Sequence, residues 1–142
     1  MARGDKKKAV SFRFDAGTVE RLKERSAEVG SRQGVLAERY IEEGLRMDGH
    51  PGIAFRDGGS GRRPSLLGTR LDVAEVIETL RQNSSSVDQT ADYLDLSPAQ
   101  VETAVRYYAE YQGEVDAWIA QSRAIAERER DLGKKREAAL AR

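Results

Sequence analysis

The 142-residue sequence predicts a mainly α-helical protein with one short β-strand near its N-terminus. The strand is predicted by strict alternation over residues 9–14, where Val10, Phe12 and Phe14 are apolar and the residues between them are small or polar. Helices are predicted by apolar side chains that recur at spacings of three and four between capping residues. The hydrophobic content of 39% is enough for small cores, but not for one large core.

The predicted strand lies alone in a helical chain, so the N–H and C=O groups along both of its edges lack partners. The simplest remedy is antiparallel pairing with the same strand of a second copy. We therefore expect a homodimer. Its core is predicted to combine the apolar strand residues with inward-facing helical ones: Val10, Phe12, Phe14, Leu22, Leu36, Tyr40 and Ile41.

Two helices follow the strand. Asp15 is a candidate N-cap for a helix over about residues 16–29, and Gly30 is typical of a helix C-terminus. Ser31 is a candidate cap for a second helix that continues to about Met47. Residues 1–48 are thus predicted to form a first domain.

Residues 49–71 read as a linker followed by a small hairpin. The linker is rich in glycine and proline, and two short strands at 53–56 and 63–67 flank the glycine-rich stretch 57–61. The hairpin leads into a helical segment.

Three further helices are predicted at about 73–82, 87–94 and 98–112 because each has a clear N-terminal signal. The signals are candidate capping boxes, formed by Asp72 with Glu75, Ser86 with Gln89 and Ser97 with Gln100. Pro98 occupies the favoured first helical position. These helices define a predicted unit over 72–113.

Residues 114–142 are predicted to form a C-terminal helical arm after a break at Gly113. Its apolar stripe is thin, so the helix either packs on another surface or frays. Trp118, Ile119 and Ile125 are the candidate anchors for a partner protein. The alternative is that Trp118 and Ile119 pack on the helix over 98–112.

Several functions are disfavoured by composition. The chain has one histidine, His50, in the linker, and it has no cysteine, so we expect neither catalysis nor a metal site or cofactor. No apolar run approaches the length of a membrane span, and no signal-peptide core follows the basic start. We therefore expect a cytoplasmic protein with no membrane partner.

The charge distribution favours nucleic acid locally. The formal net charge is zero, yet residues 1–13 carry five basic residues against Asp5 alone: Arg3, Lys6, Lys7, Lys8 and Arg13. A two-stranded ribbon fits the major groove of B-DNA, and its outer side chains Ala9, Ser11 and Arg13 would face the bases. Lys6, Lys7 and Lys8, with Ser31 and Arg32 at the turn before the second helix, are candidate phosphate contacts. The alternative is a strand that serves only dimerisation.

Residues 8–47 resemble the ribbon-helix-helix family, which includes the Arc, MetJ and CopG-type repressors and many antitoxins. The resemblance lies in Val10–Asp15, read as the strand, and in Gly30–Leu36, read as the turn into the second helix. It implies a ribbon-helix-helix dimer in which Ala9, Ser11 and Arg13 face the bases while Ser31 and Arg32 clamp phosphates. Ala9 departs from the family pattern because its side chain cannot hydrogen-bond a base.

Residues 51–112 resemble a small bacterial domain often found in antitoxins paired with PIN-like toxins. The resemblance lies in Arg62-Arg63-Pro64, in Gly68-Thr69-Arg70 and in the turn Leu94–Pro98. It implies a hairpin followed by helices of helix-turn-helix type. If the last helix read DNA, the candidates would be Gln100, Thr103 and Arg106. The acidic residues of this segment argue against that role, because phosphate repels them: Asp88, Asp92, Asp95 and Glu102.

Taken together, these features predict a repressor that binds double-stranded DNA as a homodimer, or as a dimer of dimers. The resemblances imply the antitoxin of a type II toxin–antitoxin pair, which regulates its own operon and masks a toxin protein. The alternatives are a stand-alone transcription factor and a protein-interaction adaptor.

Overall fold

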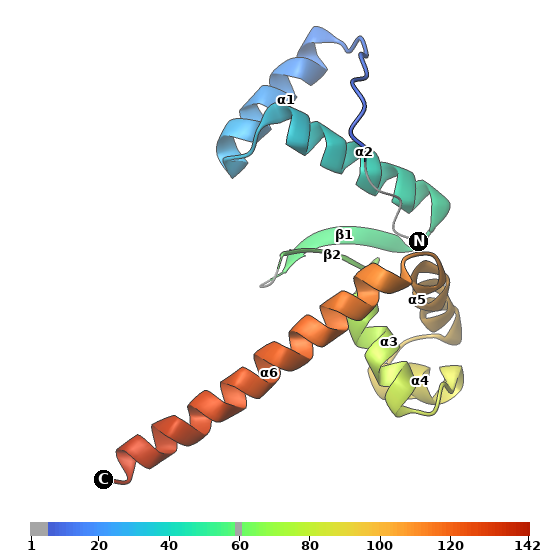
Figure 1. Cartoon of the computed structure of the whole chain (residues 1–142). Coiled ribbons are helices and arrows are strands. Elements are labelled where there is room, and N and C mark those ends of the chain that lie inside the picture. The colour runs from blue at the N-terminus through green and yellow to red at the C-terminus, as the bar shows by residue number, and fades with distance from the viewer. Residues whose placement is uncertain (1–5, 59–60) are drawn as a thin grey trace. The chain divides into compact units, whose positions relative to one another are not determined.

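The computed structural model describes residues 6–58 and 61–142 and shows a mainly helical chain with one small antiparallel sheet (Figure 1). Arg3 and Asp5 of the predicted basic arm, and Gly59 and Ser60 of the predicted turn, lie outside the described residues. The chain divides into two compact units, Met1–Gly44 and Leu45–Arg142, called here the N-terminal and C-terminal units.

The first predicted strand is not formed in the single chain. Residues 6–15 have no regular secondary structure, and the side chains of residues 9–14 are exposed. A strand exists only through hydrogen bonds to a second strand, and none of the described residues pairs with this segment. The alternating residues 9–14 therefore have no strand to pair with among the described residues of one copy.

Helices α1 (Ala16–Val29) and α2 (Gln33–Gly49) follow. Gly30 ends α1 in the left-handed conformation at φ 65°, and the N–H of Ser31 donates to the carbonyl of Ser26, as in a Schellman cap. Asp15 stands at the N-cap of α1, but its side chain makes no capping hydrogen bond.

The start of α2 differs from the prediction. The helix begins at Gln33 and ends at Gly49, and the hydroxyl of Ser31 donates to the carbonyl of Arg32 instead of accepting from a helical N–H. The carbonyl of Ser31 accepts from the hydroxyl of Ser26. Ser31 therefore belongs to the turn that closes α1.

The predicted hairpin is present as β1 (Ile53–Gly58) and β2 (Gly61–Leu66), paired from Ile53 with Leu66 to Gly58 with Gly61. The inner half of β2 is buried, and Ser65 forms an isolated bridge to Asp72. One face of the hairpin thus covers the helices that follow.

Helices α3 (Val73–Gln82) and α4 (Val87–Leu94) have the predicted bounds. Asp72 and Glu75 form the complete predicted capping box. Ser86 accepts from the N–H of Gln89, which is only half of the predicted box.

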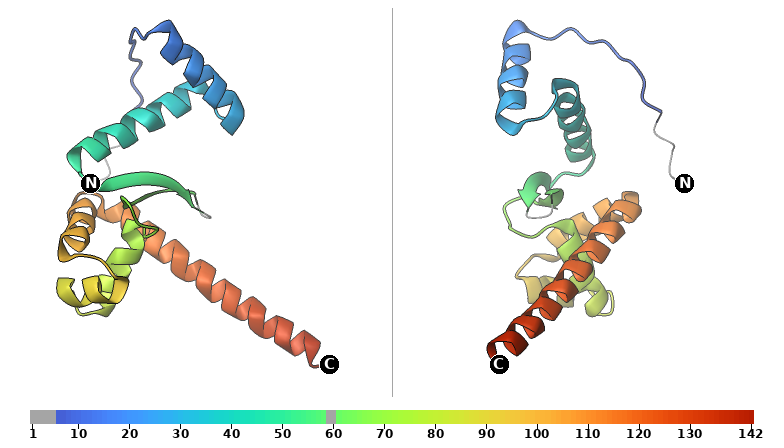
Figure 2. Two further views of the ribbon diagram at one scale, coloured as in Figure 1. Left: turned by 180° about the vertical axis from the view of Figure 1, so that it is seen from behind. Right: turned by 60° about the vertical axis from the view of Figure 1, so that its left-hand side comes forward.

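Helices α5 (Pro98–Glu110) and α6 (Gln112–Leu140) meet at Tyr111. The predicted box of Ser97 with Gln100 is complete. The break was predicted at Gly113 and occurs at Tyr111, so Gly113 lies in the first turn of α6. Figure 2 shows the C-terminal part of α6 extending past α3, α4 and α5.

The C-terminal unit has one hydrophobic core, to which the hairpin, α3, α4, α5 and the first turns of α6 all contribute. Its buried members are Ile53, Leu66, Val73, Ala74, Val76, Ile77, Ala91, Val101, Ala104, Tyr107, Val115 and Ile119. The segments predicted as hairpin, three-helix unit and arm therefore share this core.

Candidate nucleic-acid interface

The N-terminal unit exposes the apolar face that the sequence predicts to be a dimer core. Phe12 is 65% exposed, and the rings of Phe12 and Phe14 lie 6.1 Å apart between centroids, on the same side of the segment. The exposed large hydrophobic side chains of this unit are Val10, Phe12, Phe14, Val29, Val35, Tyr40 and Ile41.

Leu36, at 1% exposed, is the one buried hydrophobic residue among the described residues of the N-terminal unit. Leu22 is half-buried. Phe14, Leu22, Tyr40 and Ile41 line an apolar groove of about 340 Å³ between the N-terminal segment, α1 and α2. A unit that buries so little apolar surface cannot offset the entropy of ordering its chain.

The candidate base-facing residues Ala9, Ser11 and Arg13 are all exposed. The guanidinium of Arg13 makes no ion pair within residues 6–58 and 61–142. Its side chain is therefore open to solvent in the described part of the chain.

The candidate phosphate contacts differ from one another. Lys7 Nζ lies 2.6 Å from Glu38 Oε1, an exposed ion pair of the kind that contributes little to stability. Lys6, Lys8 and Arg32 are exposed and have no ion pair in the described part of the chain, while Ser31 is half-buried in the turn before α2. The structure places Arg32 at the N-terminus of α2, as predicted.

The alternative recognition helix, α5, has fewer unengaged side chains among its candidate residues. Gln100 Oε1 accepts from the N–H of Ser97, and the hydroxyl of Thr103 donates to the carbonyl of Ala99. Only Arg106 of the three candidates keeps its side chain exposed and unengaged among the described residues. Of the two candidate surfaces, the N-terminal unit therefore has more exposed and unengaged candidate side chains among the described residues.

The structure corrects the prediction that Trp118 and Ile119 are exposed anchors for a partner protein. Ile119 is 2% exposed in the core of the C-terminal unit, and Trp118 is half-buried against that core, where it also lies under the guanidinium of Arg63. The alternative was that both residues pack on the helix over 98–112; they pack on the shared core of the unit, and α6 as a whole contacts α3 more than α5. Only Ile125 is exposed.

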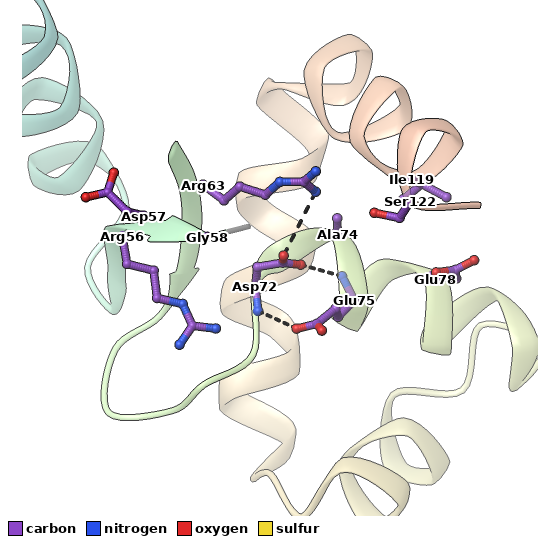
Figure 3. A pocket seen from close by; sticks show the side chains of 10 residues that line it. All are labelled: Arg56, Asp57, Gly58, Arg63, Asp72, Ala74, Glu75, Glu78, Ile119 and Ser122. Atoms are coloured by element: carbon purple, nitrogen blue, oxygen red, sulfur yellow. Dashed lines mark hydrogen bonds and ion pairs between the residues drawn. The ribbon is translucent and has the colours of Figure 1, made fainter. Parts of the chain in front are cut away.

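A cavity of about 430 Å³ in the C-terminal unit holds many charged side chains (Figure 3). Asp72 and Glu75 are engaged in the cap of α3, and Glu78 lies 2.9 Å from Arg123. Arg63 is buried, 4.0 Å from Asp72, and donates to Gln121. Most of the charged groups of this cavity are therefore engaged with one another.

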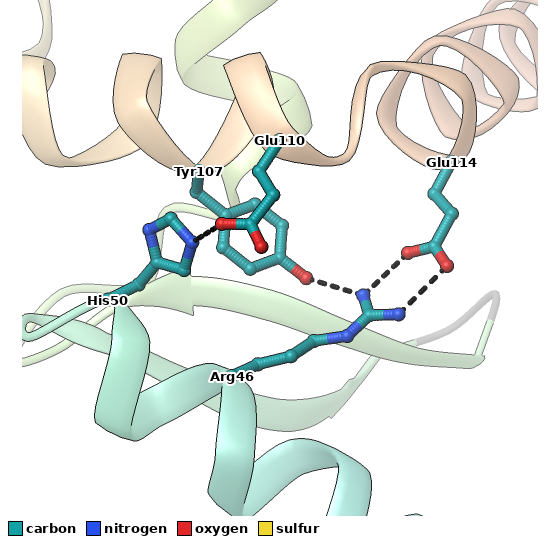
Figure 4. A network of polar contacts seen from close by, with 5 residues as sticks. All are labelled: Arg46, His50, Tyr107, Glu110 and Glu114. Atoms are coloured by element: carbon teal, nitrogen blue, oxygen red, sulfur yellow. Dashed lines mark hydrogen bonds and ion pairs between the residues drawn. The ribbon is translucent and has the colours of Figure 1, made fainter.

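Sequence reasoning missed a polar network around Tyr107 (Figure 4). Arg46 Nη1 donates to the Tyr107 hydroxyl at 2.9 Å, and Arg46 is paired with both carboxylate oxygens of Glu114 at 2.7 and 3.0 Å. His50, predicted as a solvated linker residue, lies with Nε2 2.5 Å from Glu110 Oε2 and packs against Tyr107. No local pattern joins residues so far apart in sequence.

One residue of this network, Tyr107, has a shifted pKa. Burial raises the pKa of Tyr107 to about 12, although the guanidinium of Arg46 acts in the opposite direction.

Residues 6–58 and 61–142 contain no cluster of His, Asp or Glu suited to a metal ion. None of their helices combines the length and the apolarity needed to cross a membrane.

Comparison with known proteins adds one finding. Residues 53–108, from β1 to the last turn of α5, match a family described as "Protein of unknown function (DUF433)". No curated protein and no solved structure matches the chain. The matched segment covers the hairpin, α3, α4 and nearly all of α5, and it excludes the N-terminal unit and the whole of α6.

Proposed function

We propose that this protein is a homodimeric, sequence-specific DNA-binding repressor whose N-terminal segment forms a two-stranded ribbon with that of a second copy. One observation carries the proposal: the N-terminal unit exposes an alternating apolar segment and both helices, and buries a single hydrophobic residue among its described residues. Pairing with a second copy would cover the Val10, Phe12 and Phe14 face, and would turn the opposite face outward.

That opposite face has the chemistry of a base-reading surface. Ser11 and Arg13 alternate with the apolar residues, and Lys6 and Lys8 precede them without ion pairs in the described chain. Arg pairs bidentately with guanine, while lysines near the backbone supply affinity independent of sequence. Both requirements of a DNA-binding ribbon are therefore met by residues within one segment.

The proposal is tested by binding to DNA from upstream of its own gene, measured by fluorescence anisotropy at several salt concentrations. Arg13→Ala is expected to cost about 1–3 kcal/mol and to relax specificity at one position per half-site. Lys8→Ala is expected to weaken binding to all sequences alike and to lower the salt slope by about two units, one per copy. Lys23→Ala, on α1 and without an ion pair, is the matched control.

Unchanged operator affinity in a folded Arg13→Ala dimer would contradict the groove assignment. A protein that dimerises but shows no salt-dependent DNA binding would favour the alternative, an adaptor whose ribbon serves only dimerisation.

Within this class, we propose that the repressor is the antitoxin of a type II toxin–antitoxin pair. The support is the resemblance of both segments to antitoxin domains. Co-expression with the product of the adjacent reading frame separates an antitoxin from a stand-alone repressor. An antitoxin restores growth that the neighbour arrests, whereas a neighbour without effect on growth leaves a stand-alone repressor.

A further inference from the structure

Helix α6 changes character at Arg123. Before it, Val115 and Ile119 are buried, Arg81 is paired with Asp116 at 2.6 Å, and Arg123 is paired with Glu78. Beyond it, every residue is exposed, and none makes an ion pair or a side-chain hydrogen bond within the described chain. About 25 Å of helix, at 1.5 Å per residue, therefore has no partner in its own chain.

This exposed part has one continuous face. Ile125, Glu129, Leu132, Arg136 and Leu140 follow one another at spacings of three and four, so they align on one side of the helix. Leu132 is 47% exposed. The face alternates apolar side chains with one acidic and one basic residue, which is an order that a copy running in the opposite direction complements.

Antiparallel alignment centred between Leu132 and Gly133 matches this face to itself. It sets Ile125 at the height of Leu140, Ala126 at that of Ala139 and Glu129 at that of Arg136. Two-fold symmetry forms the Glu129–Arg136 contact twice.

Gly133 is the second observation. It lies inside an exposed helix, and a Cβ added there would meet nothing within 4 Å, so nothing in its own chain requires a glycine. A glycine inside a helix costs about 0.5–1 kcal/mol relative to alanine. In the antiparallel alignment Gly133 lies beside the symmetry axis, where a missing side chain lets two helices approach closely.

We propose that the exposed part of α6 is a second self-association surface, which packs antiparallel against the same helix of another copy. The contact is small for an independent interface, so it depends on the copies being held together elsewhere. It uses residues 123–140 only and does not depend on DNA binding. In this proposal the chain has two different self-association surfaces.

The chain has no cysteine, so a single introduced cysteine reports the contact in the full-length protein. Leu132→Cys places a thiol beside the proposed axis and is expected to form a disulfide-linked dimer under mild oxidation. Glu127→Cys, on the opposite side of the helix, is the matched control for random collision. Ile125→Cys controls orientation, because two copies of residue 125 lie about 22 Å apart in the antiparallel alignment.

Charge exchange in the Leu132→Cys background tests the specific pairing. Glu129→Arg or Arg136→Glu alone sets like charges against each other twice and is expected to slow cross-linking at least about tenfold. The double exchange, Glu129→Arg with Arg136→Glu, is expected to restore it. Circular dichroism confirms that each variant keeps its helix.

Rapid cross-linking of Leu132→Cys alone, with loss and recovery on charge exchange, supports the proposal. Equal cross-linking of Glu127→Cys, efficient cross-linking of Ile125→Cys, or no recovery in the double exchange overturns it. Failure of DNA binding leaves this result unaffected, so the two proposals fail separately.

Discussion

At the scale of single residues, the most constrained side chain is Tyr107. It is fully buried, its ring packs against those of His50, Phe55 and Tyr111, and its hydroxyl accepts from Arg46. Burial keeps this hydroxyl protonated to high pH because a phenolate there would be desolvated, although the guanidinium of Arg46 favours the phenolate. The stability of the C-terminal unit therefore depends on the protonation of one phenol.

The unfolding free energy is expected to fall as pH rises from about 10 to about 12. The pKa of Tyr107 is about 12 in the folded chain against 10 for an exposed tyrosine. Between these values the unfolded chain releases the proton and the folded chain keeps it, so rising pH favours unfolding. Urea titrations at pH 8.5 and 11 measure the effect, and Tyr107→Phe serves as the reference. An equal decline in the variant would show that other groups cause it.

At the scale of elements, the helix ends follow from local chemistry. Ser97 with Gln100 and Asp72 with Glu75 satisfy N–H groups that the helix itself leaves unpaired, and Gly30 adopts a left-handed conformation that other residues avoid. These signals are local in sequence, so they predict where α1, α3 and α5 begin or end. Asp95, also left-handed at φ 56°, ends α4 in the same way without glycine.

Substitution by alanine is expected to change stability in opposite directions at two glycines that lie four residues apart, Gly30 and Gly34. Gly30→Ala places a side chain at φ 65° and is expected to destabilise the protein by about 1–2 kcal/mol. Gly34→Ala lies inside α2 with open space around its Cβ, and is expected to stabilise by up to about 1 kcal/mol. Thermal unfolding at one protein concentration compares them. A shift in the same direction for both variants would contradict the assigned turn.

At the scale of the whole molecule, the two units differ in how they are stabilised. The C-terminal unit encloses a core around Val76, Val101 and Tyr107. The N-terminal unit has two helices, but its apolar residues surround a groove instead of a core. Among the described residues, the C-terminal unit thus buries its apolar surface within one copy, whereas the N-terminal unit leaves most of its apolar surface exposed.

Folding of the N-terminal unit is expected to depend on protein concentration, because only association completes its core. Phe12→Ala is expected to cost about 3–5 kcal/mol, the range for a buried phenylalanine, although Phe12 is exposed in the single chain. Leu67→Ala, equally exposed but on the C-terminal unit, is the control and is expected to have little effect. Denaturation at several concentrations with sedimentation tests this. A folded monomer at micromolar concentration would show that no ribbon forms.

The sequence by itself determined the bounds of α1, α3 and α4, the hairpin, and two complete capping boxes, because these depend on contacts within a few residues. It also located the alternating segment over residues 9–14, although the strand itself needs a second chain. The tertiary structure decided where the apolar stripes are buried. Trp118 and Ile119 have the pattern of exposed anchors, yet α3 lies beside them and takes them into a core. It also decided that His50 and Arg46 meet residues some sixty positions away, because burial and ion pairing are set by neighbours in space and not in sequence.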